Sequence, residues 1–255
     1  MQAAELFEQG IRPLEVARRL RVSDKSAYQW HELWRAGGGG SMARRMREEA
    51  FRVEQEQGRY APHVRPINEM VDVLREQDGR GWMPYVAPWH GGAEARVLSI
   101  LRDPGPKTQE GAGSGFLCVE NDDPTAELQA QIFEEAGIAP REVTPWNAYP
   151  WYINRPPNAA ELQAGVEVLK QLLGLMPKAE VVLLQGNEAQ DVWRRLLKTH
   201  PETVRDRTLE VVSTYHPGRQ AVFVRDPEER ARRAQHRIDS YQKVGDALLG
   251  TGGQM

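Results

Sequence analysis

Two titratable residues, Asp103 and His216, each follow a short apolar run and stand directly before a Pro-Gly pair. The runs, residues 97–101 and 209–213, are rich in apolar and β-branched residues, as is typical of strands buried on both faces of a parallel sheet. Ligands of such sheets bind beyond the carboxyl ends of the strands, so we expect Asp103 and His216 to face each other across one cleft. A carboxylate and an imidazole placed in this way can stabilise opposite charges that develop during a reaction.

Two further segments carry side chains that suit a planar, polar ligand. Residues 145–152 follow an expected strand near Val143 and are dense in aromatic residues around Asn147. Residues 114–118 read Ser-Gly-Phe-Leu-Cys, with Phe116 at the centre. The amide of Asn147 can donate and accept hydrogen bonds at once, and the ring of Phe116 offers a face for stacking. Alternatively, Asn147 caps a turn and Phe116 belongs to the core.

In this order along the chain, the segments resemble the uracil-DNA glycosylase superfamily over about residues 97–220. The strand that ends in Asp103-Pro104 is similar to the first catalytic motif of that family, and residues 215–217 are similar to the second. Residues 114–118 resemble the segment that supplies a stacking aromatic. Asn147 stands in a segment similar to the region that reads the base. Each match is weak alone, and the four in order are specific.

The resemblance implies a DNA-repair hydrolase that cleaves the N-glycosidic bond of uracil, or a related base, flipped out of DNA. An ionised Asp103 would hold a water and stabilise the sugar cation. His216 would hydrogen-bond the base oxygen on which negative charge grows. Phe116 would stack on the base, and Asn147 would read its edge. The activity is expected to need no metal and no cofactor.

The sequence departs from the family pattern at several positions. Gly105, which is expected to shape the base pocket with Pro104, stands where the best-known branch has a tyrosine that blocks the methyl group of thymine. Selectivity against thymine is therefore open. Cys118 is the only cysteine, which excludes an internal disulfide, a four-cysteine iron–sulfur cluster and a cysteine-rich zinc site.

The turn after His216 also differs from the family, because Gly218-Arg219 replaces a serine-containing turn. Arg219 and Tyr215 are our candidates for DNA contact on this side of the cleft, although a solvated surface position would also explain Arg219.

Residues 42–255 alternate strand and helix patterns. Besides the strands already named, residues 181–184 form an apolar run. The predicted helices lie near residues 123–137, 158–172, 188–198 and 227–248. This alternation predicts a three-layer α/β/α body around a central, mainly parallel, four-stranded sheet.

A Gly-Gly-Gly-Gly-Ser run at residues 37–41, followed by Met42, separates this body from a short head, residues 1–36. Such runs are flexible linkers. This one resembles an engineered fusion joint, with a natural glycine-rich linker as the alternative. The head predicts three short helices and resembles the all-α helix-turn-helix of transposases and small regulators. Lys25 and Gln29 are its candidate DNA contacts, unless the head is a helical hairpin that does not bind DNA.

The head has too few residues to bury Trp30, Leu33 and Trp34 alone. We therefore expect its third helix to dock on a glycosylase-like body, in cis or on a neighbouring chain, with DNA containing uracil or a related base as the other partner. The alternative for the whole chain is a non-catalytic DNA- or protein-binding member of the fold that forms a complex with a helix-turn-helix partner.

The bulk composition excludes several classes of protein. With 255 residues, 40% hydrophobic and 27% charged, the chain is ordinary for a globular protein. A net charge of -3 provides no global basic field, so any positive DNA-binding surface must be local. No apolar run approaches the roughly 20 residues of a membrane span, and the first residues lack a signal-peptide pattern. A cytoplasmic location is expected.

Overall fold

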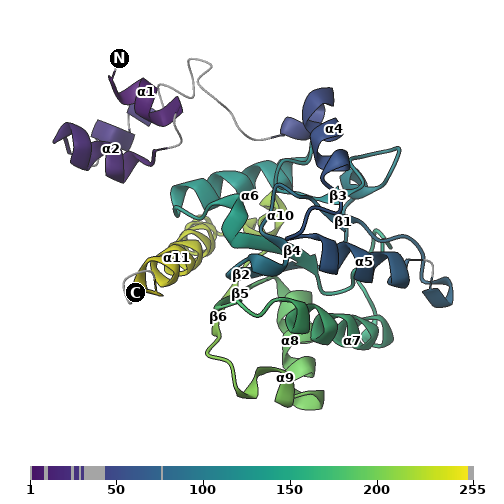
Figure 1. Cartoon of the computed structure of the whole chain (residues 1–255). Coiled ribbons are helices and arrows are strands. Elements are labelled where there is room, and N and C mark those ends of the chain that lie inside the picture. The colour runs from purple at the N-terminus through teal and green to yellow at the C-terminus, as the bar shows by residue number, and fades with distance from the viewer. Residues whose placement is uncertain are drawn as a thin grey trace. The chain divides into compact units, whose positions relative to one another are not determined.

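A computed structural model describes residues 2–8, 11–23, 26–28, 30–31, 44–75 and 77–251. The chain forms two compact units, residues 1–43 and 44–255 (Figure 1). The expected linker at residues 37–41, and the candidate DNA contacts Lys25 and Gln29, lie outside the described residues.

The first unit is helical, as predicted. It contains α1 (Gln2–Glu8) and α2 (Pro13–Leu20), followed by helical residues at 26–28 and 30–31. Pro13 opens α2, where the missing N–H costs no hydrogen bond. Phe7, buried, contacts the ring of His31 at a centroid distance of 4.8 Å. Trp30 is 39% exposed. The rest of the expected third helix, including Leu33 and Trp34, falls outside the described residues.

The second unit is built on a four-stranded sheet of the order β4-β2-β5-β6, in which every neighbouring pair is parallel. The strands are β2 (Val97–Leu101), β4 (Val143–Asn147), β5 (Val181–Gln185) and β6 (Glu210–Thr214). This confirms the predicted sheet.

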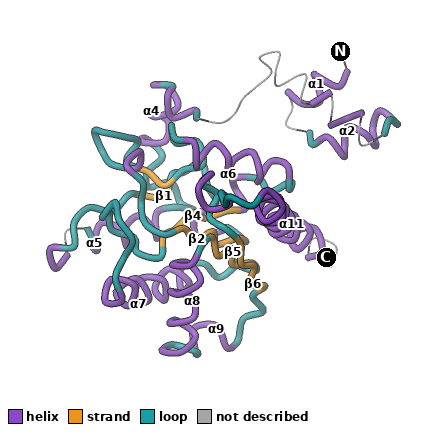
Figure 2. The backbone as a smooth tube through the Cα atoms, turned by 180° about the vertical axis from the view of Figure 1, so that it is seen from behind, coloured by secondary structure: helices purple, strands orange, loops and turns teal. Residues whose placement is uncertain are grey.

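Helices cover both faces of this sheet, which confirms the three-layer α/β/α prediction (Figures 1 and 2). Alternate residues of the strands enter two separate cores. One core joins Leu98 and Val182 to α7 (Ala159–Leu175) and α8 (Asn187–Thr199). The other core joins the opposite face to α6 (Pro124–Glu135) and α11 (Pro227–Thr251).

Two helix starts follow the local chemistry that the sequence predicts. Asp123 caps α6, because its Oδ1 accepts hydrogen bonds from the N–H groups of Thr125 and Ala126 at 2.8 and 3.0 Å. Asn158 and Glu161 form a complete capping box at the start of α7. These bonds fix the residues at which the two helices begin.

The remaining elements are short. A second, two-stranded parallel sheet pairs β1 (Tyr85–Val86) with β3 (Phe116–Leu117). The other helices are α4 (Glu49–Gln57), α5 (Arg65–Leu74), α9 (Glu202–Arg205) and α10 (Arg219–Val222). The 3₁₀ turns are η1 (Arg45–Arg47), η2 (Gln77–Gly79), η3 (Gly92–Glu94), η4 (Pro106–Thr108) and η5 (Pro140–Glu142). Over the described residues, no helix has the length and apolarity that a membrane span requires.

Candidate active site

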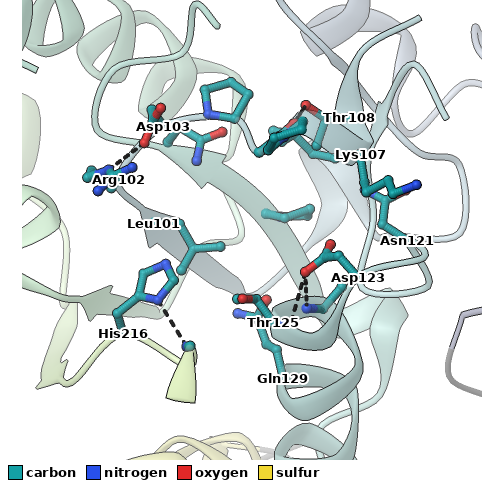
Figure 3. Close-up of a pocket in the computed structure, with 18 of the residues that line it drawn as sticks. Leu101, Arg102, Asp103, Lys107, Thr108, Asn121, Asp123, Thr125, Gln129 and His216 are labelled. Carbon is teal, nitrogen blue, oxygen red and sulfur yellow. Dashed lines mark hydrogen bonds and ion pairs between the residues drawn. The ribbon is translucent and has the colours of Figure 1, made fainter. Parts of the chain in front are cut away.

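A pocket of about 880 Å³ lies beyond the carboxyl ends of the strands of the large sheet. The structure brings Asp103 and His216 together in its lining. Figure 3 shows Asp103, Arg102 and His216 along one side of the pocket, with Lys107, Asn121 and Asp123 along the other. The site thus has the position at which parallel sheets bind their ligands.

Asp103 lies two residues beyond β2, and its side chain is only 4% exposed. Its Oδ1 accepts a hydrogen bond from Nε of Arg102 at 2.5 Å. Burial raises the pKa of Asp103 above its ordinary value, whereas the Arg102 hydrogen bond and charge, and a bond from the backbone of Arg155, lower it. The result is a carboxylate removed from bulk water and held in one orientation.

His216 lies two residues beyond β6, and the turn after it sets its protonation. The N–H of Gly218 donates to Nδ1 at 3.0 Å, so the neutral ring carries its proton on Nε2. Burial lowers the pKa of His216 to about 4, and the charges of Arg102 and Arg237 act in the same direction. At pH 7 the imidazole is therefore neutral and has one N–H to donate.

Asn147 is the last residue of β4 and is paired in register with Leu101 of β2. It lines the pocket and is 3% exposed, and its Oδ1 has no hydrogen-bond partner in the described part of the chain. A buried acceptor without a partner costs about 1–3 kcal/mol. A ligand that brings an N–H group to this atom would recover that cost.

Two of the other predicted pocket residues lie where the sequence suggested, and a third does not. Pro104 and Gly105 line the pocket, and a Cβ built on Gly105 would meet nothing within 4 Å. Phe116 is outside the lining. Its ring is 2% exposed and packs at 6.2 Å from the ring of Tyr85, while the next residue, Leu117, faces the pocket. This placement favours the core alternative for Phe116 and supports no stacking on a ligand.

The two predicted DNA contacts near His216 lie beside the pocket. Tyr215 is outside the lining, with its ring 5.5 Å from that of His236 and 5.4 Å from the guanidinium of Arg233. Arg219 is the first residue of α10, whose next residues, Gln220 and Ala221, line the pocket.

The sequence reasoning missed several polar residues of the pocket. Asn121 lines it and is held by Ser114, whose hydroxyl donates to Oδ1 at 2.6 Å. Gln129 also lines it and donates to Gln185 of β5 at 3.0 Å. Glu188 lines the pocket from the start of α8. The carboxyl-end rule, applied to the apolar run 181–184, would have found Glu188.

No group of three or more His, Cys, Asp or Glu side chains that could hold a metal ion occurs among the residues that the structure describes.

Comparison with protein-family models gives one match to each unit. Residues 88–236 match the model described as the uracil DNA glycosylase superfamily, and residues 1–39 match a homeodomain-like domain. The first match contains Asp103, Asn147 and His216 and confirms the resemblance found in the sequence. A search among curated proteins gave no match.

Proposed function

The chain belongs to the uracil DNA glycosylase superfamily, and on this premise we propose that its body hydrolyses the N-glycosidic bond of uracil, or a closely related base, in DNA. The observation that supports this most is the convergence of Asp103, Asn147 and His216 in one pocket, from the ends of three strands. Each of the three has the properties that the reaction requires.

The reaction separates charge. When the bond between C1′ of the sugar and the base nitrogen breaks, its electron pair moves to the base and positive charge remains on the sugar. The carboxylate of Asp103, fixed by Arg102, stabilises that cation. The neutral His216 donates its Nε2–H to the base oxygen on which negative charge grows. A donor aimed in advance at such an oxygen contributes about 10²- to 10³-fold in rate.

In this proposal, Asn147 recognises the base. Its buried Oδ1 needs a donor, and the ring N–H of uracil provides one. A base inside a duplex cannot reach a pocket of this kind, so the nucleotide has to leave the helix or be single-stranded. The open space beside Gly105 leaves room for a substituent on the base.

The homeodomain-like match indicates DNA as a partner of the first unit as well. We propose that this unit increases the local concentration of DNA near the body through the chain that joins them, and that Lys25 and Gln29 contribute to the contact. Docking of the Trp30 face of its third helix on a body is a separate proposal. It is tested by cutting the joint at residues 37–41 with an inserted protease site and asking whether the pieces co-elute.

The direct test is to incubate the full chain with oligonucleotides that contain one uracil, single- and double-stranded, and to measure free uracil by mass spectrometry. Release of free uracil supports the proposal. A matched oligonucleotide that carries thymine at the same position is the control. Tight binding of both oligonucleotides without any release would instead support the non-catalytic alternative, which the homeodomain-like match favours.

A further inference from the structure

Each strand of the large sheet has, at or beyond its carboxyl end, a polar residue that lines the pocket. In the spatial order β4-β2-β5-β6, these residues are Asn147, Asp103, Glu188 and His216. Glu188 lies three residues past the end of β5, as the second residue of α8. Its strand is therefore the one between the strands that precede Asp103 and His216.

The carboxyl group of Glu188 lies in the neighbourhood of Asp103 and His216. A Cβ built on Gly186, the residue before α8, would lie 4.0 Å from Oε2 of Glu188 and 3.5 Å from Cβ of His216. The charge of Glu188 also acts on Asp103, whose pKa it raises. The Glu188 side chain is thus near both residues that the proposed reaction uses.

Glu188 differs from Asp103 in its partners. Oδ1 of Asp103 is engaged by Arg102, and the backbone of Arg155 donates a further hydrogen bond. Within the described residues, by contrast, no hydrogen bond or ion pair joins the carboxyl group of Glu188 to another group. The charge of Glu188 in the first turn favours the helix dipole, but this interaction does not occupy its oxygens with a hydrogen bond. Glu188 does not cap α8, so its oxygens are available to a ligand.

We propose that Glu188 is a second catalytic carboxylate, which accepts the proton of the attacking water while Asp103 stabilises the sugar cation. The inference rests on the proposed function. In the step, the bond from C1′ to the base breaks with its electron pair on the base, and the water oxygen bonds to C1′. The water proton passes to Glu188 and then to solvent or to the departing base. Two carboxylates that divide such work are a known solution for glycosidic bonds.

Substitution of Glu188 tests this role in single-turnover release of the base. A proton acceptor contributes about 10²- to 10⁴-fold, so Glu188→Gln should slow release by about 10²-fold or more at pH 7. Glu188→Asp, which keeps the carboxylate, should restore part of the rate. Glu49→Gln is the matched control, since Glu49 is an exposed glutamate in the first turn of α4. It should release base at the wild-type rate.

The pH profile tests whether the charge of Glu188 acts on Asp103 during the reaction. Asp103 faces the charges of Arg102 and Glu188 and a backbone hydrogen bond from Arg155. Removing the negative charge of Glu188 lets the pKa of Asp103 fall. In Glu188→Gln, the residual activity should therefore persist to lower pH than in the wild type. A loss of rate caused by local misfolding would not shift the acid limb in this way.

A binding measurement covers the case in which the wild type releases no base. Oligonucleotides with a cationic pyrrolidine in place of the sugar are compared with oligonucleotides that carry a neutral tetrahydrofuran. We expect a preference for the cation that falls about tenfold in Glu188→Gln. If the wild type shows that preference but releases no uracil, the hydrolysis proposal fails. The result would still support a position of the Glu188 carboxylate close to the sugar. If Glu188→Gln equals the wild type in rate, pH profile and cation preference, the inference is wrong.

Discussion

Replacing Asn147 by leucine should stabilise the protein while abolishing its proposed activity. Asn147 is 3% exposed, and its Oδ1 lacks a hydrogen-bond partner within the described residues. Leucine has nearly the same shape and brings no buried acceptor, so the substitution removes a cost of about 1–3 kcal/mol. The expected increase in the free energy of unfolding is about 1–2 kcal/mol, or about 2–6 °C in the melting temperature of the body.

The chain offers a matched control in Asn68, which is fully buried and fully bonded. Its Nδ2 donates to the carbonyls of Arg59 and Val86, at 2.6 and 3.0 Å, and its Oδ1 accepts from the N–H of Val86 at 2.9 Å. Asn68→Leu leaves three backbone groups without partners. At about 1–3 kcal/mol for each buried group, this variant should lose about 3 kcal/mol or more.

The assay is denaturant unfolding of the full chain, followed by the tryptophan fluorescence of the body, for the wild type and both variants. Opposite signs for the same substitution are the expected result, together with base release that falls by at least about 10²-fold in Asn147→Leu. If Asn147→Leu loses as much stability as Asn68→Leu, the amide oxygen is satisfied within the fold. The site would then not use it for a ligand.

Four further substitutions test the pocket and the fold around it. Gly165→Ala should destabilise the body by about 1–3 kcal/mol and slow base release, because its Cβ would lie 1.9 Å from the carbonyl oxygen of Ala148, next to Asn147. Gly174→Ala, in the same helix and with no atom within 4 Å, should gain up to about 1 kcal/mol, and denaturant unfolding measures both. Arg102→Gln removes a charge that lowers the pKa of both Asp103 and His216, so the acid limb of the release profile should move to higher pH; an unmoved limb would contradict the assigned pair. His90 is fully buried, its pKa is lowered to about 4 by burial, and its Nε2 accepts from the N–H of Val119 at 3.2 Å. Since the unfolded chain binds the proton below about pH 6.5, His90 should contribute a loss of about 3 kcal/mol of stability between pH 6.5 and 4. His90→Leu should remove this contribution and leave that of His216, so the slope in unfolding experiments should become smaller.

The sheet and its helices could be predicted because their signals are local. The runs at residues 97–101 and 181–184 are buried on both faces, and the observed strands begin at the same residues. Asp123 with Pro124, and Asn158 with Glu161, cap helices through bonds that span three residues or fewer. Such signals need no knowledge of distant parts of the chain.

Whether the ring of Phe116 faces the core or the pocket could not be predicted in this way. β3 has only two residues, too few for an alternating pattern to show which side chain faces the core. Tyr85, against which Phe116 packs, comes from β1, some 30 residues earlier. The assignment therefore depends on a long-range contact that a local pattern does not contain.

Glu188 was missed for a different reason. Asp103 and His216 stand before Pro-Gly pairs and so attract attention, whereas Glu188 is one glutamate in an ordinary amphipathic helix. The structure places it in the same pocket, because β5 lies between β2 and β6. The partners of Asp103 have a similar origin, since Arg155 approaches it from a segment 52 residues away along the chain.

The central claim is that Asp103 acts on a base-bearing nucleotide held in this pocket. The most direct test is single-turnover release of uracil from an oligonucleotide by the wild type and by Asp103→Asn, with the affinity of each for the same oligonucleotide measured in parallel. We predict release by the wild type, a rate lower by about 10²-fold or more in the variant, and equal affinity in both. Equal rates in the two proteins would show that Asp103 only shapes a turn, and would contradict the account.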